Sequence, residues 1–315
     1  MNINNERPDI IEFIPDAGEL IRTEEGLYKV GDGRTTFPNL PFVRLEEIGV
    51  DKKYGLGCLK SPYDARDYMF SSVAYGLQKE RFPKEYISME HILPFDQGST
   101  SMCCACATAM SRLIWERNEN PTIDRFSPGY IYGNRCKSVV VDGVYNGEGM
   151  YLKDALKQLN SVGVCFYDRL PTFGNYKQVN SAYLTVKDEA DKEAFPYRTT
   201  SYYAVKTERE IKKAIMTTGS VLISFLVTSG WYDAQDDGII PTYGTIEGGH
   251  AVLLVGWKII NDKQYWVILN SWGKDWGDNG YGYIETTEMA MEAYCILDEI
   301  QCNTLKEESA SNYRW

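Results

Sequence analysis

The order of the hydrophobic patterns is the feature that most constrains the fold. Apolar residues recur at helical spacing in TAMSRLIWE, which begins at Thr108, and helices are also predicted over 151–159 and 207–217. Apolar runs of β character, broken by Gly and Asn-Asp turns, follow them: SVLISFLV, HAVLLVGWKII and KQYWVILNSW. Helices first and strands afterwards predict an α+β protein with a helical half, an antiparallel sheet or barrel half, and a cleft between them for a site.

Residues 1–46 are predicted to form a small β-rich unit ahead of one larger domain over 47–315. Short apolar-polar alternations and Gly-Asp-Gly turns in DAGELIRTEEGLYKVGDGRTTFPNLPFV predict short strands. This segment resembles the β-rich module at the N-termini of many bacteriophage tail-fibre and receptor-binding proteins, in its Gly-Glu-Leu start, its Leu-Tyr-Lys-Val-Gly-Asp-Gly hairpin and its Asn-Leu-Pro end. An ordinary β-rich extension is the alternative. A unit this small is expected to dock to a neighbour or to copies of itself.

Composition argues against several classes of function. A formal net charge of −11 opposes binding to nucleic acid or to an anionic membrane. The N-terminal residues MNINNERPDIIEF lack the basic and apolar regions of a signal peptide, and no stretch approaches the roughly 20 apolar residues of a membrane span. The eight cysteines lack the spacing of a disulfide framework, so we expect free thiols and synthesis in a reducing compartment.

The two histidines limit any mechanism that needs an imidazole. His91 has no partner motif and is expected to be structural or exposed. His250 lies in GGHAVLLVGW, where a predicted strand would hold its ring. Asn270 ends a predicted strand twenty residues later, and its amide oxygen can accept the imidazole N–H and orient the ring. Trp272 would keep water away from that bond.

A cluster of cysteines in FDQGSTSMCCACATAM offers a nucleophile. Cys103 is predicted at a helix N-terminus, where the helix dipole and a nearby imidazolium would lower the pKa of a thiol. The amide of Gln97 and the backbone N–H of Cys103 could then stabilise an oxyanion. Cys104 and Cys106 are alternative nucleophiles. A zinc site is disfavoured because neither a second Cys-x-x-C nor a suitably spaced histidine follows the cluster.

Three patches in this order, Gln-x5-Cys, Gly-His-Ala and Asn-Ser-Trp-Gly, resemble the papain family of cysteine peptidases over about residues 60–300. The resemblance implies a two-lobed fold with Cys103, His250, Asn270 and Gln97 as catalytic residues, and no metal or cofactor. Only Cys103 has the six-residue distance from Gln97. Substrate-binding roles are predicted for four further residues, of which the first two fall near the substrate-backbone-binding glycines of the family: Gly147, Gly149, Gly249 and Trp272.

The chain also departs from the family pattern. Where the family has Cys-Gly-Ser-Cys-Trp, residues 100–104 read Thr-Ser-Met-Cys-Cys, so the usual disulfide cysteine is missing and the tryptophan is replaced. This fits a reducing compartment and resembles intracellular bacterial members, while Ser101 and Met102 narrow the nucleophile loop. No clear inhibitory propeptide is found, and residues 47–96 are expected to run extended over the domain surface.

The predicted function is therefore a cysteine endopeptidase that hydrolyses peptide bonds by a Cys-His-Asn mechanism. This function and the N-terminal resemblance together predict a phage tail protein that acts on host surface or tail proteins. We expect it to be made in the host cytoplasm and located in the virion, or otherwise to be cytoplasmic. Its expected partners are a protein or peptide substrate, other tail proteins and copies of itself, but no nucleic acid. The alternatives are a catalytically silent tail protein with the papain fold and a Cys-His hydrolase of cell-wall peptides.

Overall fold

The computed structural model describes residues 54–74, 81–88, 92–135, 148–234 and 236–298, together with four short strands at 20–22, 28–30, 140–141 and 144–145. Of the predicted N-terminal unit, only β1 (Leu20–Arg22) and β2 (Tyr28–Val30) are among these residues, and they pair antiparallel. The tail-like module and its boundary at residue 46 therefore remain predictions. His91 also lies outside the described residues.

The helical half is built around one buried helix, α2 (Cys103–Glu119), whose side chains are buried from Cys103 to Trp115. It starts at Cys103, as predicted, and the small residues at its start are buried on every side. Short 3-10 turns lie at Tyr167–Arg169 and Phe195–Tyr197. The other helices of this half are α3 (Pro128–Gly133), α4 (Leu152–Ser161) and α5 (Tyr176–Ala194).

The other half is an antiparallel sheet with the strand order β12-β11-β10-β9-β13-β8, and β4 pairs with the far part of β10. Asn261 and Asp262 join β10 to β11 with φ angles of 50° and 64°, the left-handed conformation of a tight two-residue hairpin. The strands of this sheet are β4 (Tyr86–Ile87), β8 (Ser201–Ala204), β9 (Val221–Thr228), β10 (Ile246–Ile260), β11 (Lys263–Leu269), β12 (Tyr281–Ile284) and β13 (Ala290–Leu297).

Two helices and a 3-10 turn accompany the sheet. They are α1 (Phe70–Val73), α6 (Glu208–Thr218) and the turn Ser229–Asp233. The ends of α6 match the sequence prediction because Thr207 and Glu210 form a capping box and Gly219 ends the helix with a φ of 84°.

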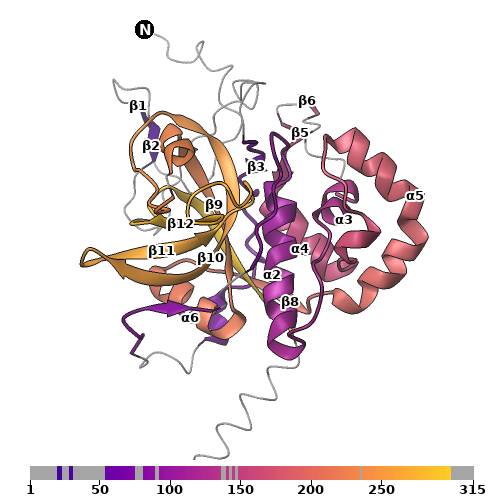
Figure 1. The fold of residues 1–315 in the computed structure, drawn as a ribbon, viewed down its shortest axis with the longest axis horizontal. Coiled ribbons are helices and arrows are strands. Elements are labelled where there is room, and N and C mark those ends of the chain that lie inside the picture. Colours follow the sequence, from indigo (N-terminus) through magenta and orange to yellow (C-terminus); the bar gives the residue numbers. More distant parts are fainter. Residues whose placement is uncertain are drawn as a thin grey trace, which may run out of the picture.

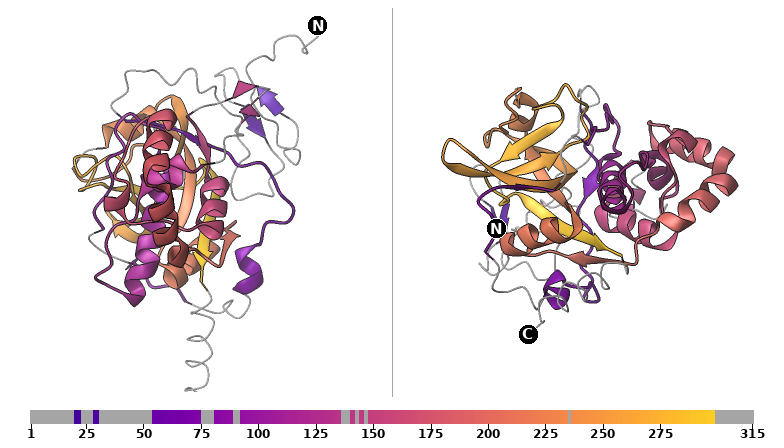
Figure 2. Two further views of the ribbon diagram at one scale, coloured as in Figure 1. Left: turned by 90° about the vertical axis from the view of Figure 1, so that its right-hand side faces the viewer. Right: turned by 60° about the horizontal axis from the view of Figure 1, so that its bottom comes forward.

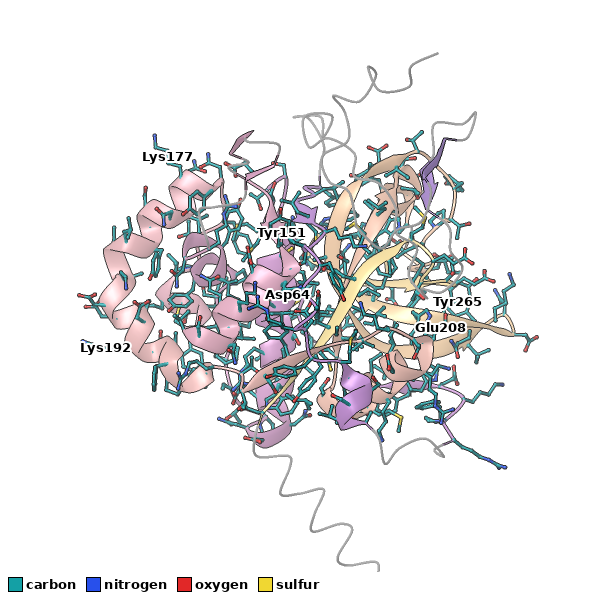
Figure 3. All side chains as sticks on the ribbon, turned by 180° about the vertical axis from the view of Figure 1, so that it is seen from behind. Asp64, Tyr151, Lys177, Lys192, Glu208 and Tyr265 are labelled. Carbon is teal, nitrogen blue, oxygen red and sulfur yellow. The ribbon has the colours of Figure 1, made fainter. Side chains whose placement is uncertain are left out.

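The two halves share the sheet as a common wall. One hydrophobic core joins α2, α3 and α4 to one sheet face, and a second joins α6 and a tryptophan cluster to the other face. Figure 1 and the right-hand view of Figure 2 show α2, α3, α4 and α5 gathered on one side and the strands of the main sheet on the other. Figure 3 places Lys177 and Lys192 on the outer side of the helical half, and Tyr151 between the halves. The predicted α+β class with two halves is confirmed.

Two further pairs of short strands lie outside the main sheet. β3 (Cys58–Leu59) and β7 (Met150–Tyr151) pair in parallel, and β5 (Val140–Val141) pairs with β6 (Val144–Tyr145). None of the described helices is both long enough and apolar enough to cross a membrane.

Candidate active site

The start of α2 presents Cys103 toward the sheet half, where it is fully buried. His250 lies on β10 and Asn270 directly follows β11, which is the neighbour of β10 in the sheet. The hairpin between these two strands therefore brings residues twenty positions apart side by side. Helix packing against the sheet brings the cysteine to the same place, since α2 packs on β10.

His250 and Asn270 form a direct hydrogen bond. The ring Nε2–H donates to the amide Oδ1 of Asn270 over 2.7 Å, and both residues are fully buried. Because Nε2 is engaged in this way, Nδ1 is the ring nitrogen that is left to act on Cys103, whose pKa His250 lowers. Trp272 stacks on the ring with centroids 4.6 Å apart and an angle of 28°, and Trp231 meets its edge at 6.3 Å. The aromatic cover shields the His250–Asn270 bond from water, as a stable ring orientation requires.

The environment of Cys103 favours its thiolate. Burial raises the pKa of this thiol, but hydrogen bonds from Cys104 and His250, the charge of His250 and a backbone hydrogen bond from Ala251 outweigh burial and hold the pKa well below its usual range. The position at the N-terminus of α2 acts in the same direction because unpaired backbone N–H groups face the sulfur.

The thiols of the neighbouring Cys104 and Cys106 have raised pKa values instead. Burial and the adjacent thiols raise the pKa of Cys104 well above its usual range, and its Sγ–H donates to the carbonyl of Met150 over 3.3 Å. Burial also raises the pKa of Cys106, next to the charge of Cys103. Both are therefore neutral thiols, and of the three cysteines only Cys103 is held as a thiolate.

Gln97 lies beside the start of α2 with its carboxamide fixed at both ends. Its Oε1 accepts a hydrogen bond from the Ser271 hydroxyl over 2.7 Å, and its Nε2 donates to the carbonyls of Thr100 at 2.6 Å and Gly55 at 3.1 Å. The Ser271 contact ties Gln97 to the turn that carries Asn270. One hydrogen-bond network thus links the predicted oxyanion donor to the predicted orienting residue.

The predicted substrate-binding residues, as far as they are described, lie where the two halves meet beside Cys103 and His250, and we call this junction the groove. Gly149 directly precedes β7 and is buried, Gly249 directly precedes His250, and Trp272 covers the His250 ring. Gly147 lies outside the described residues.

A segment of the chain itself occupies this groove, which the sequence did not predict. We call residues 54–67 the strap. Its first six residues are buried, and β3 lies between the two halves (Figure 1). Gly57 donates its N–H to the carbonyl of Gly249 over 3.1 Å and accepts a hydrogen bond from the N–H of Met150 over 2.9 Å. The expectation that residues 47–96 run over the domain surface is wrong for this part of the chain.

The strap fits because it carries glycines, which have no side chain, where the groove is narrow. A Cβ atom on Gly57 would lie 2.4 Å from the Cβ of Ser101, and one on Gly55 would lie 2.1 Å from the carbonyl oxygen of Thr100. Only glycine can pass these points without a shift of the nucleophile loop. The carbonyl of Gly55 also accepts from Gln97 Nε2 and, at 3.3 Å, from Trp272 Nε1. The strap therefore occupies the side-chain donors of both Gln97 and Trp272.

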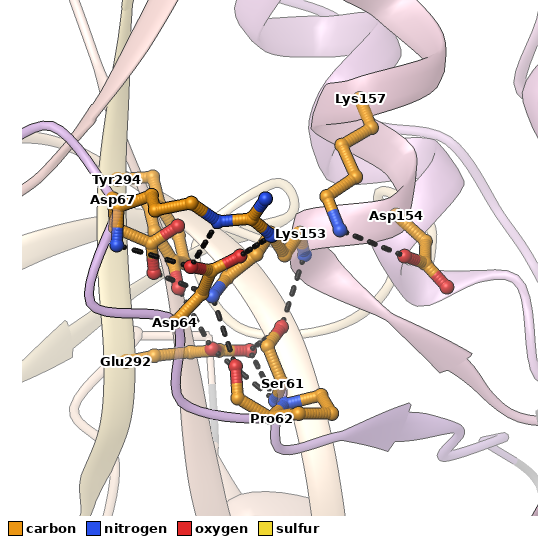
Figure 4. Close-up of polar contacts among 10 residues, drawn as sticks. Ser61, Pro62, Asp64, Asp67, Lys153, Asp154, Lys157, Glu292 and Tyr294 are labelled. Carbon is orange, nitrogen blue, oxygen red and sulfur yellow. Dashed lines mark hydrogen bonds and ion pairs between the residues drawn. The ribbon is translucent and has the colours of Figure 1, made fainter.

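The far end of the strap is fixed to both halves, as Figure 4 shows. The hydroxyl of Ser61 donates to the Glu292 carboxylate over 2.9 Å, and its backbone N–H donates to the same group over 3.2 Å. Lys153 donates to the carbonyl of Pro62 over 2.9 Å and pairs with Asp67. Because Glu292 belongs to the sheet half and Lys153 to α4, the strap bridges the groove. The Gly-Leu-Gly pattern at 55–57 is the sequence feature that could have indicated a segment passing through a narrow space.

Comparison with known proteins places this geometry in a family. The model of the papain family cysteine proteases matches residues 96–303. A cathepsin B-like protein of Giardia intestinalis, CP2, is 29% identical over 209 residues, which cover 64% of this chain and 66% of that protein. The chain thus spans just under two thirds of the length of this relative.

Solved structures agree with the match. Xylellain, a cysteine protease from Xylella fastidiosa, superposes with a TM-score of 0.65 and 25% identity, covering 78% of this chain and 97% of that one. Procathepsin B S9 from Trypanosoma congolense has the same fold, with a TM-score of 0.59 and 17% identity over 78% of this chain and 86% of that one. The predicted papain-like fold is therefore confirmed.

These relatives correct the predicted location. They are cathepsin-like proteins and a cysteine protease of cellular organisms. The prediction of a phage virion, with synthesis in a host cytoplasm or otherwise a cytoplasmic place, is therefore wrong. The family match, the shared fold and the grouping of a cysteine, a histidine and an asparagine in one groove agree with one another: the chain belongs to the papain family of cysteine proteases.

Proposed function

We propose that this chain is a cysteine endopeptidase in which Cys103 is the nucleophile, His250 the acid and base, and Asn270 the residue that orients His250. The observation that carries the proposal is the His250–Asn270 hydrogen bond of 2.7 Å beside a cysteine whose pKa is held well below its usual range. Gln97 and the backbone N–H of Cys103 serve as the oxyanion donors. Gly149, Gly249 and Trp272 bind the substrate.

The reaction follows from these positions. The Cys103 thiolate forms a bond to the peptide carbonyl carbon, and the oxygen takes the negative charge beside Gln97. The carbon–nitrogen bond then breaks as His250 gives its proton to the leaving amine. Water attacks the resulting thioester while His250 accepts a proton from it, and the carbon–sulfur bond breaks to return the thiolate.

In the form described here the enzyme is latent, because the strap fills the groove that a substrate must enter. The backbone contacts of Gly57 with Gly249 and Met150 are the kind that a substrate backbone would make. The expected partner is a protein or peptide substrate. Because the predicted virion location is wrong, a tail-associated role and tail proteins as partners form no part of the proposal, and association of this chain with copies of itself stays a prediction.

A catalytically silent protein with this fold is the second candidate, and the filled groove with its narrow Thr100–Ser101 loop is the observation that favours it. Thiol labelling separates the two. An enzyme is expected to react with iodoacetamide at Cys103 at neutral pH, and the His250→Ala variant is expected to lose this reaction. When the strap is displaced by Gly57→Ala, the enzyme is also expected to cleave an unfolded protein, whereas the same chain with Cys103→Ser does not. If Cys103 is labelled equally in wild type and in His250→Ala, and no protein is cleaved, the chain is the catalytically silent protein. Purified peptidoglycan as a parallel substrate would reveal a hydrolase of cell-wall peptides.

A further inference from the structure

Gly149 and Met150 form a short length of backbone against which the strap lies, and we call these two residues the backbone edge. The N–H of Met150 donates to the carbonyl of Gly57 in the strap over 2.9 Å. Among the described strands, β7, which begins at Met150, pairs only with β3 of the strap. A substrate that replaces the strap therefore meets an edge that has lost its strand partner, so other contacts have to keep its shape.

Side chains of the helical half hold the carbonyl groups of this edge. Arg135, two residues beyond the end of α3, donates from its guanidinium to the carbonyl of Gly149. Cys104 on α2 donates from its thiol to the carbonyl of Met150 over 3.3 Å. Because neither donor belongs to the strap, both hydrogen bonds can persist when the strap leaves the groove.

The guanidinium of Arg135 is itself held between two rings. The residue is only 4% exposed, and its Cζ lies 4.1 Å from the ring centroid of Tyr176 and 5.0 Å from that of Tyr132. The Tyr132 hydroxyl also donates to the carbonyl of Glu148, one residue before the edge, over 2.6 Å. The N–H of Tyr176 donates to the Glu148 carboxylate over 3.0 Å. A planar guanidinium packed in this way has little freedom to turn, so its hydrogen bond fixes where the Gly149 carbonyl lies.

We propose that Arg135 is a positioning residue for substrate binding, because it holds the backbone edge through the Gly149 carbonyl in the shape that pairs with a substrate backbone. The inference rests on the proposed function, in which Gly149 binds the substrate. Arg135 acts through Gly149 and not on the reacting groups. Its loss is therefore expected to weaken the binding of a peptide backbone while the chemistry at Cys103 and His250 is retained.

Two reagents that label Cys103 separate binding at the edge from access to the groove. Iodoacetamide carries no peptide, whereas the chloromethyl ketone of acetyl-Ala-Ala-Ala lays a peptide backbone along the groove. The strap has to leave before either reagent reaches the sulfur, so the opening of the strap affects both rates equally. The ratio of the chloromethyl ketone rate to the iodoacetamide rate therefore reports on the backbone edge.

Arg135→Met keeps most of the side-chain length but removes the donor. We expect this ratio to fall about tenfold from wild type, and Arg135→Lys, which keeps a charged donor, to restore most of it. Arg198→Met is the matched control, because Arg198 also donates to a carbonyl, that of Phe195 over 3.1 Å, and stacks on the exposed Phe195 ring at 3.8 Å. The control is expected to keep the wild-type ratio.

An unchanged ratio in Arg135→Met, or an equal fall in Arg198→Met, would overturn the proposal. Melting curves show whether each chain folds. If Arg135→Met does not fold, Arg135→Gln, with a shorter polar side chain, takes its place: a lowered ratio supports the positioning role and a wild-type ratio overturns it.

Peptide cleavage distinguishes this inference from the proposed function. In the Gly57→Ala chain, in which the strap is displaced, adding Arg135→Met is expected to raise KM for a peptide about tenfold and to leave kcat within about twofold. If no peptide is cleaved but the ratio of labelling rates still falls, the proposed function fails while Arg135 stands as a residue that positions a peptide-binding edge. Cleavage with an unchanged KM, or with a loss confined to kcat, overturns the positioning role and leaves the proposed function intact.

Discussion

His250 and Asn270 form the most tightly defined pair of side chains in the groove. Both are fully buried, and a single hydrogen bond of 2.7 Å fixes which nitrogen of the imidazole faces Cys103. The second contact of the Asn270 Oδ1, the backbone N–H of Ser271 at 2.8 Å, holds the amide in place. The orientation of the imidazole therefore depends on one acceptor atom.

Removing that acceptor is expected to cost activity more than stability. In Asn270→Ala the Nε2–H loses its partner inside a buried site, a penalty of about 1–3 kcal/mol, and the ring is free to turn. We expect kcat on an unfolded protein substrate to fall at least about tenfold. Asn270→Asp keeps an acceptor oxygen and is expected to retain more activity than the alanine variant. Equal activity of Asn270→Ala and wild type would show that Asn270 does not orient His250.

The pH dependence of thiol labelling follows from the lowered pKa of Cys103. A thiol with an ordinary pKa loses reactivity as pH falls below that value, because only the thiolate reacts. Since the pKa of Cys103 is held well below its usual range, its alkylation rate in the full chain is expected to fall less steeply between about pH 8 and pH 6 than the rate of a thiol with an ordinary pKa. In His250→Ala the burial that raises this pKa remains, so the rate is expected to fall as pH is lowered over this range. Rates measured by mass spectrometry at Cys103 decide between these outcomes.

At the scale of elements, the strap depends on glycines that no other residue can replace. A methyl group on Gly57 would meet three atoms of Ser101, all within 2.7 Å. Two of those atoms are backbone, so the nucleophile loop cannot give way cheaply. The strap itself must move.

The Gly57→Ala variant is therefore expected to open the groove. We predict that Cys103 is alkylated at least about tenfold faster than in wild type, and that cleavage of an unfolded protein rises in parallel. Because Leu56 and Cys58, on either side of Gly57, belong to the two hydrophobic cores, displacement of the strap is also expected to lower the thermal stability of the variant. Pro62→Ala, at an exposed strap position, serves as the comparison. Unchanged labelling in Gly57→Ala, with unchanged thermal stability, would contradict the proposal that the strap closes the groove.

Elements with a strong local pattern could be predicted from the sequence, and those held by distant partners could not. The prediction placed α4 and α6 within two residues because their apolar spacing is local, as is the capping box of α6. It missed α5, where only Val179, Tyr183, Ala190 and Ala194 are buried along 19 residues. It also missed the strap, since the burial of Gly57 depends on Met150 and Gly249, far along the chain. Cys103, His250 and Asn270 could be singled out because each lies in its own short motif.

At the scale of the whole molecule, the strap joins two halves that otherwise meet mainly through α2 and the sheet. Ser61 is tied to the sheet half through Glu292, and Asp67 is tied to the helical half through Lys153 (Figure 4). Tyr294 adds a hydroxyl that donates to the Glu292 carboxylate over 3.2 Å. Opening the groove therefore requires the loss of these anchors as well as of the contacts around Gly57.

Glu292 gives this anchor a pH dependence of a defined sign. Burial raises the pKa of its carboxyl, and the hydrogen bonds from Ser61 only partly oppose this. Between the unfolded pKa, near 4.3, and the higher folded pKa, the folded state holds a proton that the unfolded state has lost, so its stabilising effect falls as pH rises. Ionisation of this buried carboxyl as pH rises to neutral therefore destabilises the folded state.

We expect Glu292→Gln, which keeps an acceptor for Ser61, to raise the melting temperature at pH 7, by roughly 2–4 °C for each kcal/mol recovered. The difference from wild type should shrink as pH falls towards 4, when wild type is itself neutral at this position. Calorimetry of both chains across this range tests the argument, with Glu288→Gln as a variant at a neighbouring carboxylate. A glutamine variant that is less stable than wild type at pH 7 would mean that the charge on Glu292 holds the strap more strongly than burial opposes it.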